Sequence, residues 1–278
     1  MTFEEARNPQ PQTPGAIPHI GTYRRVLPVS LERMYENTID WAHLPYLHRS
    51  SFGKIECVRA DASGFRAWVW PQRIPQGPPF LLELTLDREL RRWISRTVEG
   101  PGTGSEIWTQ VVPISERRIE VSVDFYMPNV PIERVAATRE FLVKLYKQLY
   151  DEDEQMMTRR QVRLDEAAGR DVAKGGGDQS LGAIDEVRQR LPLSIVNADG
   201  REFRIVAIGG ELIAYAAVCP HLLGPIGESE VREGIVECPW HGYRFDVHTG
   251  ACVSGARCRL APAPRIEVDR ARKVVVHW

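Results

Sequence analysis

The sequence predicts an α+β protein in which an antiparallel sheet is followed by one long helix and then by a small all-β domain. Three observations carry this prediction. Strand-like segments separated by turn signals recur in the first half of the chain. An apolar periodicity typical of a helix then runs from Pro131 to about Ala168. Short strand-like segments return after a Gly-rich stretch.

The first domain is assigned to residues 23–168. Before it, residues 1–22 hold four prolines and few large apolar side chains, which predicts an N-terminal arm without regular structure. Ser30 is a residue type that favours helix N-caps, and a helical pattern extends from it to His48. Alternating, β-branched and aromatic residues then predict strands at 55–58, 65–70, 81–86, 93–98, 106–112 and 119–126.

The second domain is assigned to residues 183–278. It follows residues 169–182, where the run K-G-G-G-D-Q-S predicts a flexible linker. The strand-like segments after the linker are short, which is typical of a small all-β domain. We predict these strands at 193–197, 203–208, 211–217, 235–238, 265–269 and 274–278.

Length and charge exclude several classes of function. A chain of 278 residues is long enough for about two domains. Its 36 basic and 37 acidic residues give a formal net charge of −1, so we expect no nucleic-acid partner. No apolar stretch reaches the roughly 18–20 residues of a membrane span. The N-terminal residues lack the basic-then-apolar order of a signal peptide, so we expect a cytoplasmic protein.

Two cysteines and two histidines of the second domain follow a paired spacing. Cys219 and His221 form C-x-H, and after sixteen intervening residues Cys238 and His241 form C-x-x-H. Thiolates and neutral imidazoles are ligands of iron–sulfur clusters and of zinc. Zinc is the less favoured interpretation, because the C-x-H half departs from the C-x₂₋₄-C of zinc fingers.

With the run C-P-W-H-G-Y-R-F-D, this spacing resembles the Rieske [2Fe-2S] pattern. The resemblance implies that Cys219 and Cys238 hold one iron, that His221 and His241 hold the other, and that the domain transfers single electrons. High-potential Rieske proteins have a disulfide between the loops and hydroxyls that bond to sulfur, and this sequence lacks both. We therefore expect a potential near the low end of the range of roughly −150 to +300 mV.

A second motif, N-x-x-D-x-x-H-x-x-x-x-H, is formed by Asn37, Asp40, His43 and His48. Asp40 and His43 are three residues apart, so in a helix they would share a face. Pro45 is expected to break that helix, which would let His48 turn back toward the same metal.

This motif resembles the mononuclear iron site of the Rieske non-haem iron aromatic-ring-hydroxylating oxygenases, specifically their oxygenase component. The resemblance implies Fe(II) held by two histidines and one distant carboxylate, with open positions for O₂ and substrate. His43 and His48 match the histidines. Asp153, in the run Y-D-E-D-E-Q-M-M of the long helix, is the candidate carboxylate. Its acidic neighbours also stay open as the third ligand: Asp151, Glu152 and Glu154.

The resemblance further implies catalytic roles for Asp40, as the link between the two metal centres, and for Asn37, near the iron. It implies a helix-grip (START-like) fold for the first domain and a homotrimer. It also implies that an apolar, aromatic or polycyclic substrate is hydroxylated or O-/N-demethylated by a monooxygenase or dioxygenase. NAD(P)H would be oxidised by a separate reductase, with or without a ferredoxin, because the chain has no dinucleotide fingerprint.

The order of the domains departs from this family, because most of its members place the Rieske domain first. In the family, one subunit's Rieske centre lies beside the iron of its neighbour, whereas a permuted chain could pair the centres within or between subunits. An alternative hypothesis follows from the same departure. The second half would be an electron-carrier Rieske ferredoxin, fused to a helix-grip domain that binds a ligand without catalysis.

Overall fold

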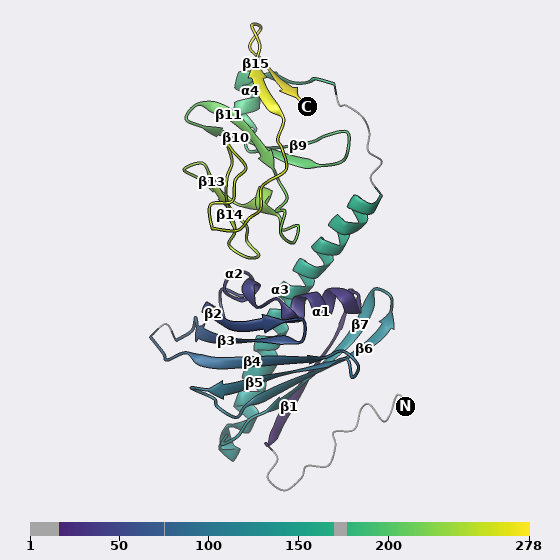
Figure 1. Cartoon of the computed structure of the whole chain (residues 1–278), viewed down its shortest axis with the longest axis vertical. Coiled ribbons are helices and arrows are strands. Elements are labelled where there is room, and N and C mark those ends of the chain that lie inside the picture. The colour runs from purple at the N-terminus through teal and green to yellow at the C-terminus, as the bar shows by residue number, and fades with distance from the viewer. Residues whose placement is uncertain (1–16, 75, 170–176) are drawn as a thin grey trace. The chain divides into compact units, whose positions relative to one another are not determined.

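The computed structural model describes residues 17–74, 76–169 and 177–278 (Figure 1). These residues form two compact units. The first unit extends to Trp41 and resumes with Gly53–Asp151, and the second combines Ala42–Phe52 with Glu152–Trp278. Most of the expected N-terminal arm, residues 1–16, lies outside the described residues.

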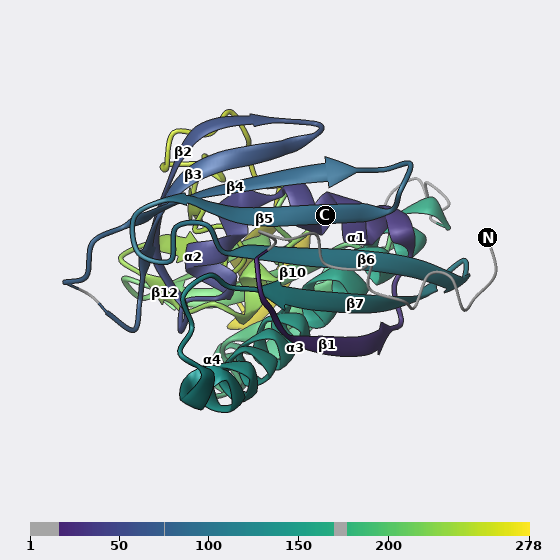
Figure 2. The same ribbon diagram turned by 90° about the horizontal axis from the view of Figure 1, so that it is seen from below.

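The first unit is built on a seven-stranded antiparallel sheet with the strand order β1-β7-β6-β5-β4-β3-β2. Figure 2 shows these strands side by side in this order. All six predicted strands are present. The bounds are β1 His19–Leu27, β2 Phe52–Asp61, β3 Gly64–Pro71, β4 Phe80–Asp87, β5 Arg92–Glu99, β6 Glu106–Ser115 and β7 Arg118–Tyr126.

Strand β1 was not predicted, and its first residues, 19–22, fall within the range assigned to the arm. It joins the edge of the sheet by antiparallel pairing with β7, with Arg24 opposite Ser122. Its sequence, H-I-G-T-Y-R-R-V-L, is mostly polar, and only Ile20 and Leu27 are fully buried. The sequence signal is weak because the strand gains its order from pairing with β7 rather than from its own apolar alternation.

Strand β7 supplies the buried face of the sheet. Ile119, Val121, Val123 and Phe125 alternate with more exposed residues and are completely buried, as the two-residue period of a strand requires. Each such side chain contributes about 1.5–3 kcal/mol through burial. Phe125 packs against Tyr146 of the long helix, with ring centroids 5.1 Å apart. The helix therefore covers this face, which confirms the predicted helix-grip arrangement.

The long helix, α3 (Val135–Ala168), follows a short 3₁₀ turn, η3 (Ile132–Arg134), and matches the predicted helical segment. It contains 34 residues and takes part in both compact units, with the division after Asp151. Within the part of the chain that the structure describes, no helix combines the length and the apolar character needed to cross a membrane.

The segment that carries the two candidate iron-binding histidines is helical but interrupted. Helix α1 (Leu31–Ile39) begins at Ser30, whose hydroxyl accepts a hydrogen bond from the Arg33 backbone N–H, as predicted for an N-cap. The helix ends at Asp40, and the 3₁₀ turn η2 (Trp41–His43) follows.

Pro45 does not break this helix, which corrects the expectation from the sequence. It lies in the first turn of helix α2 (Leu44–Leu47), where a residue without a backbone N–H is tolerated. The interruption lies earlier, at Asp40, and His48 caps the C-terminus of α2 by donating its backbone N–H to the Leu44 carbonyl.

The β-rich part of the second unit contains three small sheets with the strand orders β11-β10-β9, β12-β13-β14 and β15-β16-β8. The six predicted strands are present, whereas β8, β12, β14 and helix α4 were not predicted. The bounds are β8 Gln179–Ala183, α4 Ile184–Gln189, β9 Leu193–Val196, β10 Glu202–Ile208, β11 Glu211–Ala216, η4 Ile226–Glu228, β12 Val231–Arg232, β13 Ile235–Glu237, β14 Arg244–Asp246, β15 Arg265–Val268 and β16 Lys273–His277. Strand β8 overlaps the end of the expected linker, whose residues 170–176 lie outside the described residues.

The C-terminal half of α3 belongs to the core of this second unit. Met156 is buried in the same apolar cluster as Ile226 and Trp240 of the β-rich part, and Leu47 of α2 packs against that cluster. This packing explains why Ala42–Phe52 groups with the β-rich part of the chain.

Candidate metal centres

The two loops that carry the Cys-His pairs have matching backbone geometry. In the first loop, the Cys219 N–H donates to the Gly224 carbonyl at 2.8 Å, and in the second the Cys238 N–H donates to the Tyr243 carbonyl at the same distance. Four residues after each cysteine the backbone is left-handed, with φ 65° at Leu223 and 66° at Gly242. A leucine in this region is uncommon, so the first loop accepts a strained residue in order to keep the shared geometry.

The structure brings the four predicted cluster ligands together. Cys219 and Cys238 are 0% and 1% exposed, and the rings of His221 and His241 lie 4.6 Å apart between centroids. Gly224 fits against this group because it has no side chain: a Cβ atom there would lie 2.7 Å from Cys238 Sγ.

The two buried thiols share a hydrogen bond, which separates their acidities. That bond lowers the pKa of Cys238 to about 5 and raises the pKa of Cys219 well above its usual value. A cluster would replace the shared proton, because thiolates rather than thiols bind iron. Two thiolates and two imidazoles are the donor set of a Rieske [2Fe-2S] cluster, and Gly224 leaves space beside Cys238, so these residues fit such a cluster.

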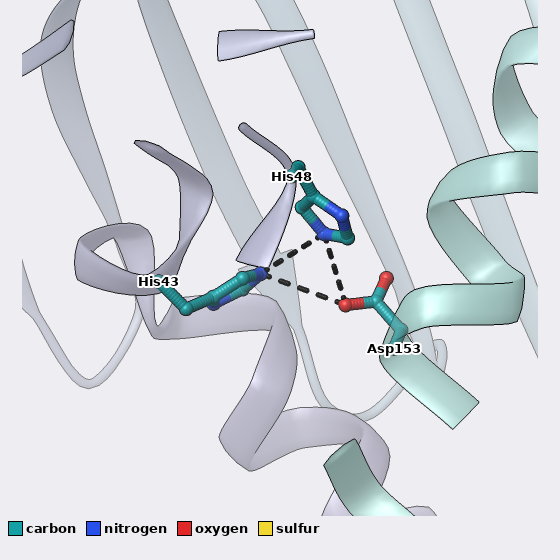
Figure 3. A group of neighbouring side chains, drawn as sticks. All are labelled: His43, His48 and Asp153. Atoms are coloured by element: carbon teal, nitrogen blue, oxygen red, sulfur yellow. Dashed lines mark hydrogen bonds and ion pairs between the residues drawn. The ribbon is translucent and has the colours of Figure 1, made fainter. Parts of the chain in front are cut away.

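The second centre consists of His43, at the end of the turn η2, His48, directly after α2, and Asp153 of α3 (Figure 3). Their exposed fractions are 3%, 2% and 8%. His43 Nε2 lies 3.3 Å from His48 Nε2 and 3.5 Å from Asp153 Oδ1, and His48 Nε2 lies 3.1 Å from the same Oδ1. Residues 105 positions apart in the sequence thus direct three donor atoms at one point.

These separations fit a single metal ion. An ion about 2.1 Å from each donor, with donors at right angles, would hold neighbouring donor atoms about 3 Å apart. Two imidazoles and one carboxylate on one side of an ion are the set that suits non-haem Fe(II), with the remaining positions open.

Glu152, which the sequence left open as a third ligand, contacts the other side of His48. The His48 Nδ1–H donates to Glu152 Oε2 at 2.6 Å, which leaves Nε2 directed at His43 and Asp153. Burial of His48 opposes its charged form, but Asp153 and Glu152 more than offset this and raise its pKa. Adjacent residues on a helix face about 100° apart, so the two acids meet different nitrogens of one ring.

The two remaining candidates, Asn37 and Asp40, lie on α1 and at its end, in the first unit. Asn37 is buried, and its carbonyl accepts the Asp40 backbone N–H at 3.2 Å. Their catalytic roles stay predictions. Tyr243 was not predicted as a site residue, although its ring lies 4.7 Å from that of His221. Its position two residues after His241 was the available signal.

Comparisons with known proteins agree with the geometry of the loops. The model of the Rieske [2Fe-2S] domain matches residues 179–264, so the chain contains such a domain. The ferredoxin subunit of anthranilate 1,2-dioxygenase from Burkholderia cepacia is 39% identical over 71 residues, which are 26% of this chain and 65% of that protein. The ferredoxin component of the p-cumate 2,3-dioxygenase system from Pseudomonas putida is 35% identical over 74 residues, 26% of this chain and 63% of that protein. The chain thus spans less than two thirds of the length of either relative.

Two solved structures are similar to parts of the chain. The ferredoxin of carbazole 1,9a-dioxygenase from Nocardioides aromaticivorans IC177 is 25% identical and covers 37% of this chain and 98% of its own, with a TM-score of 0.32. A START superfamily protein from Mycobacterium smegmatis is 17% identical and covers 50% of this chain and 99% of its own, with a TM-score of 0.41.

Proposed function

We propose that the chain is an electron-transfer protein whose Rieske domain delivers electrons to a mononuclear iron site, and that this site oxygenates a small apolar organic substrate. The similarity to two ferredoxin components supports the electron-carrier role of the domain. The observation that carries the oxygenase role is the convergence of His43, His48 and Asp153 in a buried group with metal-ligand spacing.

The cofactors would supply the redox chemistry: the cluster exchanges single electrons, and the iron offers open positions to O₂ and substrate. The chain would contribute ligation and positioning. His43 and His48 each present a ring nitrogen, and Asp153 adds a negative charge that balances part of the metal's charge. Glu152 keeps the proton of His48 on Nδ1, so that Nε2 remains available to the metal.

The reaction would require partners that this chain does not provide. Electrons would come from NAD(P)H through a separate reductase, directly or by way of a ferredoxin, because the sequence has no dinucleotide fingerprint. The substrate class, an aromatic or polycyclic compound that is hydroxylated or O-/N-demethylated, comes from the family resemblance. Catalytic roles for Asp40 and Asn37 likewise come from the resemblance.

A second candidate function is electron carriage without catalysis. It is favoured by a specific observation, because both curated relatives that the chain matches are ferredoxin components of dioxygenase systems. In this case the helix-grip half would bind a ligand, and the electrons would leave for an oxygenase on another chain. His43, His48 and Asp153 would then form a hydrogen-bonded cluster without iron.

Metal content distinguishes the two functions. We would measure iron and acid-labile sulfide in anaerobically purified protein, with an EPR spectrum after dithionite reduction. The oxygenase proposal expects about three irons and two sulfides per chain with a Rieske signal. His43→Ala should lower the iron to about two and keep the sulfide and the Rieske signal, whereas His248→Ala, an exposed control in the same unit, should change nothing.

Two irons per chain, with no further uptake when Fe(II) is added, would reject the oxygenase proposal in favour of the carrier. Loss of the Rieske signal in His43→Ala would instead mean that this histidine serves the cluster or the fold, and not a separate metal.

A further inference from the structure

The two candidate metal centres lie next to each other within the second compact unit. The ring of His43 lies 6.4 Å from the ring of His241 between centroids, at an angle of 85°. Edge-to-face rings at this separation are within the usual range of packed aromatic pairs. One of these histidines belongs to the mononuclear set and the other to the cluster set, and both come from the same chain.

Tyr46 holds the mononuclear set against the cluster loop. It lies three residues after His43, in helix α2. Its ring occupies the space that a Cβ atom on Gly242 would fill, directly beside His241. Gly242 is left-handed, with φ 66°, so the tight turn of the loop and the seat for Tyr46 both require glycine.

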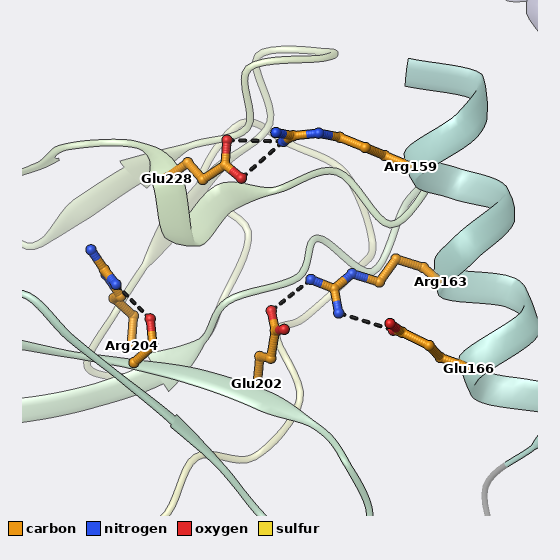
Figure 4. A network of polar contacts seen from close by, with 7 residues as sticks. Arg159, Arg163, Glu166, Glu202, Arg204 and Glu228 are labelled. Carbon is orange, nitrogen blue, oxygen red and sulfur yellow. Dashed lines mark hydrogen bonds and ion pairs between the residues drawn. The ribbon is translucent and has the colours of Figure 1, made fainter. Parts of the chain in front are cut away.

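The third donor, Asp153, belongs to the same unit, and the helix that carries it is anchored there. One helical turn after it, Met156 lies in the apolar core of the β-rich part. Further along α3, Arg159 pairs with both carboxylate oxygens of Glu228 at 2.9 Å, and Arg163 pairs with Glu202 at 2.6 Å (Figure 4). Apolar packing and ion pairs therefore hold both ligand sets in one unit of one chain.

We propose that these two centres of the same chain are the functional pair, with electrons passing across the contact of His241 with His43 and with Tyr46 as the positioning residue. The proposal rests on the proposed function. Each transfer would oxidise the cluster that His241 helps to hold and reduce the iron that His43 helps to hold by one electron, and the separate reductase would return that electron to the cluster. The trimer implied by the family resemblance, in which the centres of neighbouring subunits pair, is then not needed for electron transfer.

The test detects how close the cluster lies to the mononuclear site, and it needs no catalytic turnover. In the full chain with its cluster, Co(II) would fill the mononuclear site, with Zn(II) as the diamagnetic control. We expect Co(II), and not Zn(II), to raise the microwave power that half-saturates the EPR signal of the reduced cluster. We expect the shift to be independent of protein concentration across a dilution series that reaches the monomer, as checked by light scattering.

Variants separate the positioning role from a purely structural one. Tyr46→Ala should reduce the Co(II)-induced shift while Co(II) affinity and the visible spectrum of the cluster stay unchanged. Tyr46→Phe should retain the full shift, because the ring and not the hydroxyl fills the seat on Gly242. Tyr35→Ala, which removes a tyrosine of the first unit, is the matched control and should have no effect.

Failure of the two proposals would look different. If Co(II) does not bind, or binds equally to His43→Ala, the mononuclear site and the proposed function fail. If Co(II) binds through His43 and the cluster signal is unaffected, or if the shift disappears on dilution, the pairing within one chain is wrong. A shift in co-expressed His43→Ala and Cys238→Ser chains would assign the pairing to neighbouring subunits. If Cys238→Ser does not fold, the dilution series decides alone.

Discussion

The Nδ1–H of His48 donates a 2.6 Å hydrogen bond to the Glu152 carboxylate, on the side of the imidazole away from the other two candidate ligands. The neighbouring acid, Asp153, contacts Nε2 of the same ring at 3.1 Å. Two adjacent acids of one helix therefore have separate parts in the site. Asp153 would be a ligand, and Glu152 would orient the ligand His48.

This division predicts different losses for two matched substitutions. Glu152→Gln should weaken Fe(II) or Co(II) binding about 10- to 100-fold, the usual effect of removing a group that orients a ligating histidine. Asp153→Asn should weaken metal binding more than Glu152→Gln does, because it removes a charged donor. Glu140→Gln, on an exposed part of the same helix, is the control. Titration with each metal measures the affinities, and equal losses in both variants would contradict the assigned parts.

Gly224→Ala should abolish assembly of the cluster. The new Cβ atom would lie 2.7 Å from Cys238 Sγ, so the loops would have to separate at the ligands themselves. Gly177→Ala is the control, because none of the residues that the structure describes lies within 4 Å of a Cβ atom at that position. The visible absorption and sulfide content of the purified variants give the result, and a Gly224→Ala protein with its full complement of sulfide would show that the loops tolerate the separation.

The stability of the helix-grip sheet should depend strongly on the buried face of β7. Ile119→Ala should destabilise the protein by about 2–5 kcal/mol, because the side chain is completely buried. Ile114→Ala removes the same atoms from an exposed position on the neighbouring strand and should change stability by no more than about 0.5 kcal/mol. Urea unfolding, followed by tryptophan fluorescence, measures the change in the free energy of unfolding for both variants. Similar effects at the two positions would show that β7 is not the core strand.

The two ion pairs between α3 and the β-rich part should contribute unequally. Arg159 and Glu228 are largely exposed, so a double-mutant cycle should give a coupling energy of about 0.2–1 kcal/mol that falls as salt is added. Arg163 and Glu202 are closer, and Arg163 is less exposed, so their coupling should be larger and less sensitive to salt. Coupling energies in the reverse order would mean that burial does not govern these contacts.

The sequence by itself determined the features whose signal is local. The spacing alone predicts Cys219, His221, Cys238 and His241 as cluster ligands, because each loop supplies its candidate ligands from within four residues. The strands of both units were predictable wherever buried and exposed residues alternate, as they do in β7. The end of α3 at Ala168 was predictable from the glycines that follow it.

Only the tertiary structure decided features that depend on distant partners. Strand β1 is ordered by its pairing with β7, which lies about a hundred residues away in the sequence, and the polar sequence of β1 does not predict a strand. The acidic run of α3 offers four candidate ligands, and the orientation of the helix against His48 selects Asp153 for the site and Glu152 for Nδ1. The seating of Tyr46 on Gly242 joins segments almost two hundred positions apart. Such contacts arise from packing in three dimensions, which the local order of residues does not encode.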